Sequence, residues 1–277
     1  NYHFKMIKPI FKLFVVFAIY SVLITGCVIS NDPEYPREAA EEISDKIEKK
    51  IFEGIATKQI LKMIFDYITE YRPELKHQID LREAVCLLRP KPDFEQFIGL
   101  LLKAEGYDVK MNRILAGKCI EHEIDAIAAK DNETLYVEAK HHYQPHSYTG
   151  VGVFLEAQAT LEDLNGGKNN FTKAVVVTNA KLSEHAKTYA RCKNIGAMGW
   201  RYPDGRSLEA MIEDNKLYPV TLIKGLDPAL LARLGDNGII SVEQLAKYDV
   251  KKLARLTKVG KSKAKEILRK ANKILGK

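Results

Sequence analysis

The most regular alternation of apolar and polar positions lies between residues 121 and 142, EHEIDAIAAKDNETLYVEAKHH. Two runs rich in β-branched and aromatic residues flank Asp131-Asn132, which predicts two strands joined by a tight turn. Successive side chains of a strand point to opposite faces. One face of the second strand therefore holds Tyr136, Glu138 and Lys140, and the other holds Leu135, Val137 and Ala139. The apolar face belongs in a core, which leaves charged groups at the end of a half-buried hairpin.

Helical spacing of apolar residues dominates the chain before this hairpin. It predicts helices over residues 36–51, 58–71 and 73–88. Pro90 and Pro92 mark a boundary. The next helix is expected to begin with Asp93 as its N-cap and to end at Gly106. Its core stripe would consist of Phe94, Phe97, Ile98, Leu101 and Leu102, with Glu95 at the edge of the stripe, where it could face the acids of the hairpin.

Strands and helices alternate after residue 106. Strands are predicted at 107–115 and 195–200, and KAVVVT at 173–178 is continuous in β-branched residues, as a central strand would be. The helices between them are predicted at 153–164, after a Gly150–Gly152 turn, and at 183–193. The order predicts an α/β core.

The composition changes again after residue 220. Residues 225–245 and 253–275 read as two helical hairpins, and LTKVGKSKA at 256–264 places a glycine turn between two helices. The chain has a net charge of +7, whereas residues 251–277 alone hold eleven basic side chains and one acidic, a net charge of +10. This tail therefore carries the electrostatic attraction for a polyanion. We expect three domains: 1–90, 91–220 and 221–277.

Candidate chemistry gathers at the hairpin. The first strand can bring Asp125 beside Glu138, and carboxylates on a rigid hairpin suit a hard cation such as Mg²⁺. Lys140 could orient a water or stabilise charge on a phosphate. A plain surface ion pair is the competing interpretation of the same spacing. His122, Glu123, His141 and His142 crowd the region without a closed zinc set, so the histidines are expected to support the site or to face phosphate.

Asp125, followed thirteen positions later by Glu138-Ala139-Lys140, resembles the D…(D/E)-x-K signature of the restriction-endonuclease-like, PD-(D/E)XK nucleases. The stretches at 106–109 and 199–200 are similar to the Mrr-type branch. The resemblance implies a restriction-endonuclease-like mixed-sheet fold and a Mg²⁺-dependent DNA endonuclease in which Asp125 and Glu138 hold the metal. It also implies supporting roles for Glu95 and Gln158. A surface glutamine and an ordinary first-turn acid are the competing interpretations of these two.

The helical residues before the core resemble the second half of an ATP-cone, a small regulatory nucleotide-binding domain, above all at FEGIAT, residues 52–57. The hairpin that contacts the nucleotide in that family is not visible, because residues 13–23 are mostly apolar. ATP or a related nucleotide is therefore an expected ligand, and a plain helical bundle that positions the nuclease is the alternative.

The C-terminal turn resembles a helix-hairpin-helix unit. In such units main-chain N–H groups and the start of the second helix meet a DNA phosphate. The resemblance implies that Lys258, Gly260, Lys261 and Lys263 contact double-stranded DNA without choosing a sequence. The first unit, with Asp236-Asn237-Gly238, departs from the usual pattern and is expected to serve mainly in packing.

The first 27 residues allow two interpretations. Lys8 and Lys12 precede an apolar run that ends ITGC at Cys27, the layout of a secretory signal with a lipidated cysteine. The run is short for a membrane-spanning helix. We favour a cytoplasmic protein, because the rest resembles an intracellular DNA enzyme and four cysteines without CxxC spacing suit a reducing compartment.

Two functions stay open at this point. The first is a Mg²⁺-dependent endonuclease, with double-stranded DNA as its partner and a homodimer as a further expectation. The second is a DNA-binding or nucleotide-sensing protein that has lost catalysis and keeps Asp125, Glu138 and Lys140 as a relic of the fold.

Overall fold

The computed structural model describes residues 35–52, 55–71 and 79–277. Two compact units, Asn1–His77 and Gln78–Lys277, are described separately. The signal-like segment up to Cys27, the break at Gly54 and residues 73–78 of the third expected helix lie outside the described residues.

The described part of the first unit consists of α2 (Tyr35–Glu48) and α3 (Thr57–Tyr71). The two helices pack through buried apolar side chains, Ala39, Ala40, Ile43, Ile47 and Ile68. On the outside, Lys46 and Lys50 lie over the ring of Tyr67 at 5.6 and 5.2 Å. The helices predicted at 36–51 and 58–71 are confirmed.

The second unit begins with α4 (Leu81–Cys86), which is shorter than the helix predicted from 73 to 88. Asp80 sets its start, because the carboxylate accepts a hydrogen bond from the main-chain N–H of Glu83 at 3.0 Å. Pro90 limits its end, since a residue before proline avoids helical geometry, and Arg89 is extended (φ −68°, ψ 141°).

A π-type turn, η2 (Pro90–Phe94), leads into α5 (Glu95–Ala104). The prediction of Asp93 as N-cap is wrong. Its carboxylate is held by Arg89, whose Nε and Nη2 donate to it at 2.7 and 2.8 Å. The predicted core stripe is confirmed, because all five members are at most 5% exposed, namely Phe94, Phe97, Ile98, Leu101 and Leu102.

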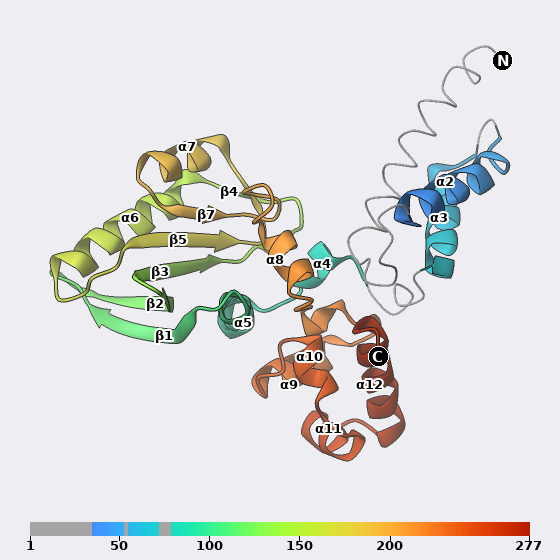
Figure 1. Ribbon diagram of the computed structural model, residues 1–277. Helices are drawn as coiled ribbons and strands as arrows, with labels where there is room; N and C mark the ends of the chain where they lie inside the picture. The colour runs from blue at the N-terminus through green and yellow to red at the C-terminus, as the bar shows by residue number, and fades with distance from the viewer. Residues whose placement is uncertain (1–34, 53–54, 72–78) are drawn as a thin grey trace, which may run out of the picture. The chain divides into compact units, whose positions relative to one another are not determined.

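A five-stranded mixed sheet follows α5 (Figure 1). Its order is β1 (Asp108–Ala116), β2 (Glu121–Lys130), β3 (Glu133–Lys140), β5 (Lys173–Thr178) and β7 (Gly196–Met198). The first three strands run antiparallel, and β3, β5 and β7 run parallel. A second, two-stranded sheet pairs β4 (Tyr148–Thr149) with β6 (Lys181–Leu182). The α/β class, the hairpin and the central position of β5 are confirmed.

Helices cover both faces of the large sheet. One face packs against α5 and α8 (Leu208–Asp214). The other packs against α6 (Val151–Gly166) and α7 (Glu184–Cys192). The α6 helix begins two residues before the predicted Val153, because Gly150 is its N-cap and Gly152 lies inside the helix.

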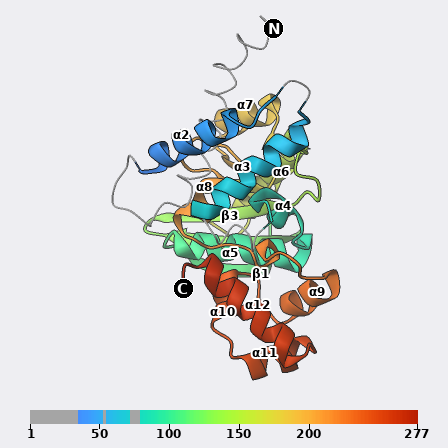
Figure 2. The same ribbon diagram turned by 90° about the vertical axis from the view of Figure 1, so that its right-hand side faces the viewer.

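Five short elements make up the C-terminal part. They are η3 (Val220–Leu222), α9 (Pro228–Asp236), α10 (Val242–Ala246), α11 (Val250–Thr257) and α12 (Lys261–Ile274). The C-terminal helices lie together below α5 (Figure 2). They share one apolar core, to which Ala84 of α4 also belongs. The hydroxyl of Thr221 donates to the main-chain oxygen of Ala84 at 2.6 Å, which fastens this part to α4. Both predicted helical hairpins are confirmed.

Candidate active site

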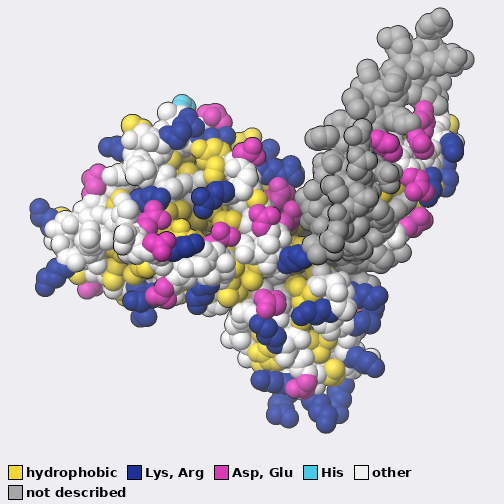
Figure 3. Space-filling model, viewed as in Figure 1, with side chains coloured by type: hydrophobic (Ala, Val, Ile, Leu, Met, Phe, Trp, Pro, Cys, Tyr) yellow, Lys and Arg dark blue, Asp and Glu magenta, His cyan; other side chains and the backbone are white. Residues whose placement is uncertain are grey.

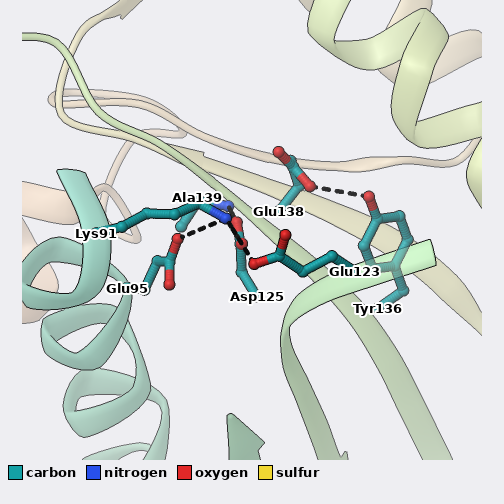
Figure 4. Close-up of polar contacts among 7 residues, drawn as sticks. All are labelled: Lys91, Glu95, Glu123, Asp125, Tyr136, Glu138 and Ala139. Carbon is teal, nitrogen blue, oxygen red and sulfur yellow. Dashed lines mark hydrogen bonds and ion pairs between the residues drawn. The ribbon is translucent and has the colours of Figure 1, made fainter. Parts of the chain in front are cut away.

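The site lies where β2 and β3 stop pairing. Their ladder ends at Ala126 opposite Val137, so Asp125 and Glu138 are the first residues beyond it. The main-chain N–H of Ala139 donates instead to Asp125 Oδ2 at 2.9 Å (Figure 4). Asp125 is only 6% exposed. Its side chain thus takes the place of a ladder acceptor, which fixes the carboxylate at the end of the hairpin.

Lys91 of η2 connects three carboxylates. Its Nζ lies 3.0 Å from Glu123 Oε1, 3.3 Å from Glu95 Oε1 and 3.5 Å from Asp125 Oδ1 (Figure 4). The lysine side chain is 59% exposed, whereas those of Glu95 and Asp125 are nearly covered. Lys91 was not predicted, because its partners Glu123 and Asp125 are more than thirty residues away and its position between two prolines gives no signal of them.

Glu95 faces the hairpin's acids, as its place at the edge of the α5 stripe predicted. It is 2% exposed. Burial, and then repulsion by Asp125, raise its pKa to about 7, while Lys91 opposes the shift. Asn112, with the left-handed φ of 49°, reaches the same carboxylate from β1. With its amide oriented to donate, its nitrogen lies 3.2 Å from Glu95 Oε2 and 3.1 Å from the main-chain oxygen of Asp125.

Glu138 and Lys140 follow on β3. Burial and repulsion by Asp125 raise the pKa of Glu138, and the positive charges of Lys91 and Lys140 act against them. The Tyr136 hydroxyl donates to Glu138 Oε2 at 2.9 Å, and Figure 4 shows the glutamate turned toward this tyrosine. Lys140 pairs with Thr178 through the main chain, whereas its exposed side chain makes no hydrogen bond or ion pair with any described residue. Its ammonium is therefore available to a ligand.

The donor set fits a hard divalent cation, because Asp125, Glu138, Glu95 and Glu123 offer only oxygen. Burial first, and repulsion by Asp125 second, raise the pKa values of Glu95 and Glu138, and Lys91 supplies a positive charge beside the acids. Within the described ranges, no three His, Cys, Asp or Glu side chains already stand in a metal-holding arrangement. Glu138 in particular would have to turn from Tyr136 to join Asp125.

Gln158, the other expected supporting residue, lies on α6. Its Nε2 donates to Glu162 Oε1 at 2.8 Å, and its buried Oε1 has no hydrogen-bond partner. No hydrogen bond in the described structure joins it to Asp125, Glu138 or Lys140.

The histidines, which were expected either to support the site or to face phosphate, make internal contacts. His141 Nε2 lies 3.3 Å from the main-chain oxygen of Val85, His142 Nε2 lies 2.9 Å from Thr149 Oγ1, and His122 Nε2 lies 2.8 Å from Asp163 Oδ2. Burial lowers the pKa of both His141 and His142, which keeps them neutral near pH 7.

A second candidate site is the turn between α11 and α12. Lys258 ends α11 in the left-handed conformation (φ 55°), and Gly260 is the N-cap of α12 without a side-chain cap. Lys258, Gly260 and Lys261 are exposed, and Lys263 lies 3.9 Å from Glu266. Basic side chains gather at this end of the C-terminal helices (Figure 3). The uncapped N–H groups and the lysines are suited to a phosphate.

The first hairpin, between α9 and α10, is occupied by internal contacts. Asp236 Oδ1 lies 2.7 Å from Arg89 Nη1, and the Asn237 amide donates to the main-chain oxygen of Arg233 at 2.7 Å. Arg233 in turn donates to the main-chain oxygen of Thr257 at 2.8 Å, which ties α9 to the end of α11. These contacts agree with the packing role expected for this hairpin.

Replacing Glu95 by glutamine is expected to stabilise the metal-free protein at pH 8 and to change little at pH 4. The wild-type carboxyl is protonated in both the folded and the unfolded chain below its ordinary pKa of 4.5. As the pH rises through about 7, the folded wild-type protein must carry a buried charge at Glu95. The rise of its pKa from 4.5 to about 7 corresponds to a loss of up to roughly 3 kcal/mol in the free energy of unfolding. Thermal unfolding in EDTA across this range measures it, with Glu121→Gln as the exposed control. If Glu95→Gln raised the melting temperature equally at pH 4 and pH 8, ionisation of the buried Glu95 would not be the cause.

Comparisons with known proteins find matches over both parts of the chain that hold these candidate sites. Residues 90–200 match the restriction endonuclease family model, and 219–273 match the model of a tandem helix-hairpin-helix. An uncharacterized protein of Archaeoglobus fulgidus is 35% identical over 176 residues, 64% of this chain and 98% of its own length. The crystal structure of AF1548, a protein of unknown function, is similar with a TM-score of 0.58 and 34% identity, over 66% of this chain and 98% of the other. None of the described helices is both long and apolar enough to cross a membrane.

Proposed function

The chain belongs to the same family as the archaeal protein and joins a restriction endonuclease domain to tandem helix-hairpin-helix units, and on this basis we propose that it is a metal-dependent DNA endonuclease. The observation that carries the proposal is the buried Asp125, held by the main-chain N–H of Ala139 where β2 and β3 separate, with the buried Glu95 beside it on a shared Lys91 contact and Glu138 on the facing strand. Excess carboxylate of this kind is costly in a folded protein unless a cation uses it.

Asp125 and Glu138 would hold the cation, and its expected identity is Mg²⁺, which prefers oxygen ligands. When bound, the metal lowers the pKa of a water and neutralises the scissile phosphate. Lys140 orients the attacking water and stabilises the negative charge that develops on the phosphate. Glu95 and Gln158 support the site from α5 and α6, and Lys91 keeps the acids together while no cation is present.

Nicking of supercoiled plasmid tests the proposal most directly. Cleavage is expected with Mg²⁺ and is expected to stop in EDTA, because the carboxylates alone cannot activate water at neutral pH. Calcium provides a control, since it binds carboxylates without supporting the same geometry. Binding of DNA without cleavage under any divalent metal would favour the second function, an inactive DNA-binding protein.

The α11–α12 turn is proposed to hold the duplex through its phosphates, with Lys258, Lys261 and Lys263 as contacts. Replacing all three by alanine is expected to lower the slope of log affinity against log salt by about 2.7, because each lost phosphate contact removes about 0.9. The weakening should be equal for unrelated duplexes. Fluorescence anisotropy between 50 and 200 mM salt measures both quantities.

Lys273, on the last turn of α12, gives the matched control, because Lys273→Ala removes one charge from the same helix away from the turn. Its slope should stay near the wild-type slope. If the triple variant keeps the wild-type slope as well, the phosphate contacts lie elsewhere in the chain.

The finer features of the proposal concern the first unit and the assembly. A nucleotide that binds the ATP-cone-like helices would alter cleavage, which plasmid assays with and without ATP would detect. A homodimer would double the molar mass in solution by light scattering. Mass analysis of the native N-terminus separates a cytoplasmic protein from one lipidated at Cys27.

A further inference from the structure

A pocket of about 580 Å³ lies beside α4, apart from the carboxylate cluster. Its walls come from α4, the segment after β3, the segment after β7 and α8. Its lining includes Asp80, Arg82, Glu83, Tyr143, Trp200, Arg201 and Glu209. A volume of this size accommodates a nucleotide-sized molecule.

The feature that points to a ligand is the guanidinium of Arg82. Its Nε and Nη2 are both buried and have no hydrogen-bond partner. Buried polar groups are almost always paired, and an unpaired cationic donor is especially costly. The ring of Trp200 lies 5.8 Å from the guanidinium carbon and holds the group in place without using its donors.

The same two nitrogens are occupied in two other arginines. Arg89 Nε and Nη2 donate to the two oxygens of Asp93 at 2.7 and 2.8 Å. Arg201 Nε and Nη2 donate to the two oxygens of Glu209 at 2.5 and 3.1 Å. This edge of a guanidinium matches a carboxylate or phosphate with two parallel hydrogen bonds. In Arg82 the edge is free, and Arg201 in the same pocket is already neutralised.

We propose that this pocket binds a small molecule that places one oxyanion, a phosphate monoester or a carboxylate, on the free edge of Arg82 and a planar ring against Tyr143. Tyr143 lines the pocket and is 70% exposed, so its ring offers an uncovered aromatic face. The pocket also carries the exposed acids Asp80 and Glu83, which repel a ligand with several negative charges. A nucleoside monophosphate therefore fits better than a triphosphate or the interior of a duplex.

Trp200 is the only tryptophan of the chain, so its fluorescence reports on the pocket in the unaltered protein. With the full chain in EDTA, adenosine 5′-monophosphate and benzoate are expected to give saturable fluorescence changes, and adenosine, which lacks the oxyanion, none. Adenosine triphosphate should bind more weakly than the monophosphate. Calorimetry on the same samples gives the affinities.

Arg82→Lys keeps the charge but loses the two-pronged edge, and it is expected to weaken binding of the monophosphate by at least about tenfold. Arg191→Lys, at an exposed position of α7, is the matched control and should bind as the wild type does. A short duplex with 5′-phosphate ends, compared with one with 5′-hydroxyl ends, shows whether the oxyanion comes from DNA ends or from a free metabolite. Absence of any saturable signal with the wild type, or equal affinity in Arg82→Lys, would overturn the proposal whatever the outcome of the cleavage assay.

Discussion

Replacing Asp125 by asparagine is expected to slow plasmid nicking by at least about a hundredfold while leaving the protein folded. Asparagine keeps an oxygen that can accept from the main-chain N–H of Ala139, the 2.9 Å bond that fixes the side chain. It removes the negative charge to which the cation and Lys91 are attracted. Loss of a single preorganised electrostatic group commonly costs two to three orders of magnitude in rate.

Asp125→Ala is the less informative change, because it combines two effects. It removes the charge, and it also leaves a buried main-chain N–H without its acceptor, which costs about 1–3 kcal/mol of stability. Comparing the two variants by thermal unfolding and by nicking separates the structural part from the chemical part. Only the alanine variant should melt at a clearly lower temperature.

Glu121→Gln is the matched control for the charge, because Glu121 is an exposed acid of the same strand. It should nick at the wild-type rate. DNA affinity in EDTA should be unchanged in Asp125→Asn, since the duplex is proposed to be held by the C-terminal lysines. Wild-type nicking by Asp125→Asn would remove the central residue of the proposed mechanism.

The hairpin could be predicted from sequence because its determinants are local. Alternation places Glu138 and Lys140 on one face of β3, and the turn at Asp131 sets the register that carries Asp125 to the level of Glu138. That register also accounts for the repulsion by Asp125 that, after burial, raises the pKa of Glu138. Glu95 was also found, since its place beside a core stripe is set by helical spacing.

Other parts of the site depend on contacts that a local pattern does not contain. Lys91 reaches Glu123 and Asp125 only because η2 lies beside β2 in the folded chain. Asn112 of β1 reaches Glu95 because its own main chain adopts φ 49°, a conformation that the sequence of this stretch does not require. The proposed ligand contact of Arg82 could not be predicted from the sequence either, since only the fold shows that its donors are buried and unpaired.

The predicted start of α5 was wrong for a related reason. Asp93 has the residue type and the position of an N-cap. Its carboxylate can either accept from main-chain N–H groups at the start of a helix or bind a guanidinium, and here it binds Arg89. The contact is favoured because the same guanidinium also binds Asp236 of α9, so three charged groups are satisfied together. A cap predicted from sequence assumes that no better partner is near, and here Arg89 is that partner, held in place in turn by Asp236 of the C-terminal helices.

Lys140→Met is expected to lower the single-turnover rate of cleavage by about a hundredfold with little change in stability. The lysine side chain is exposed and makes no hydrogen bond or ion pair with the described residues, so its removal breaks no folded contact. Its expected work is done only on the reacting phosphate and the attacking water, where developing charge makes an electrostatic partner most valuable. A fall in rate without a fall in melting temperature is therefore the expected signature.

A lysine that merely attracts DNA would behave differently. Its loss would weaken binding and lower the salt slope by about 0.9, but at saturating DNA the single-turnover rate would stay at the wild-type value. Lys110→Met on β1 removes an exposed charge of the same kind from the same sheet and serves as the control. Saturating DNA removes every effect of affinity on the rate. An unchanged single-turnover rate in Lys140→Met would therefore mean that Lys140 only binds the duplex and takes no part in catalysis with the carboxylates.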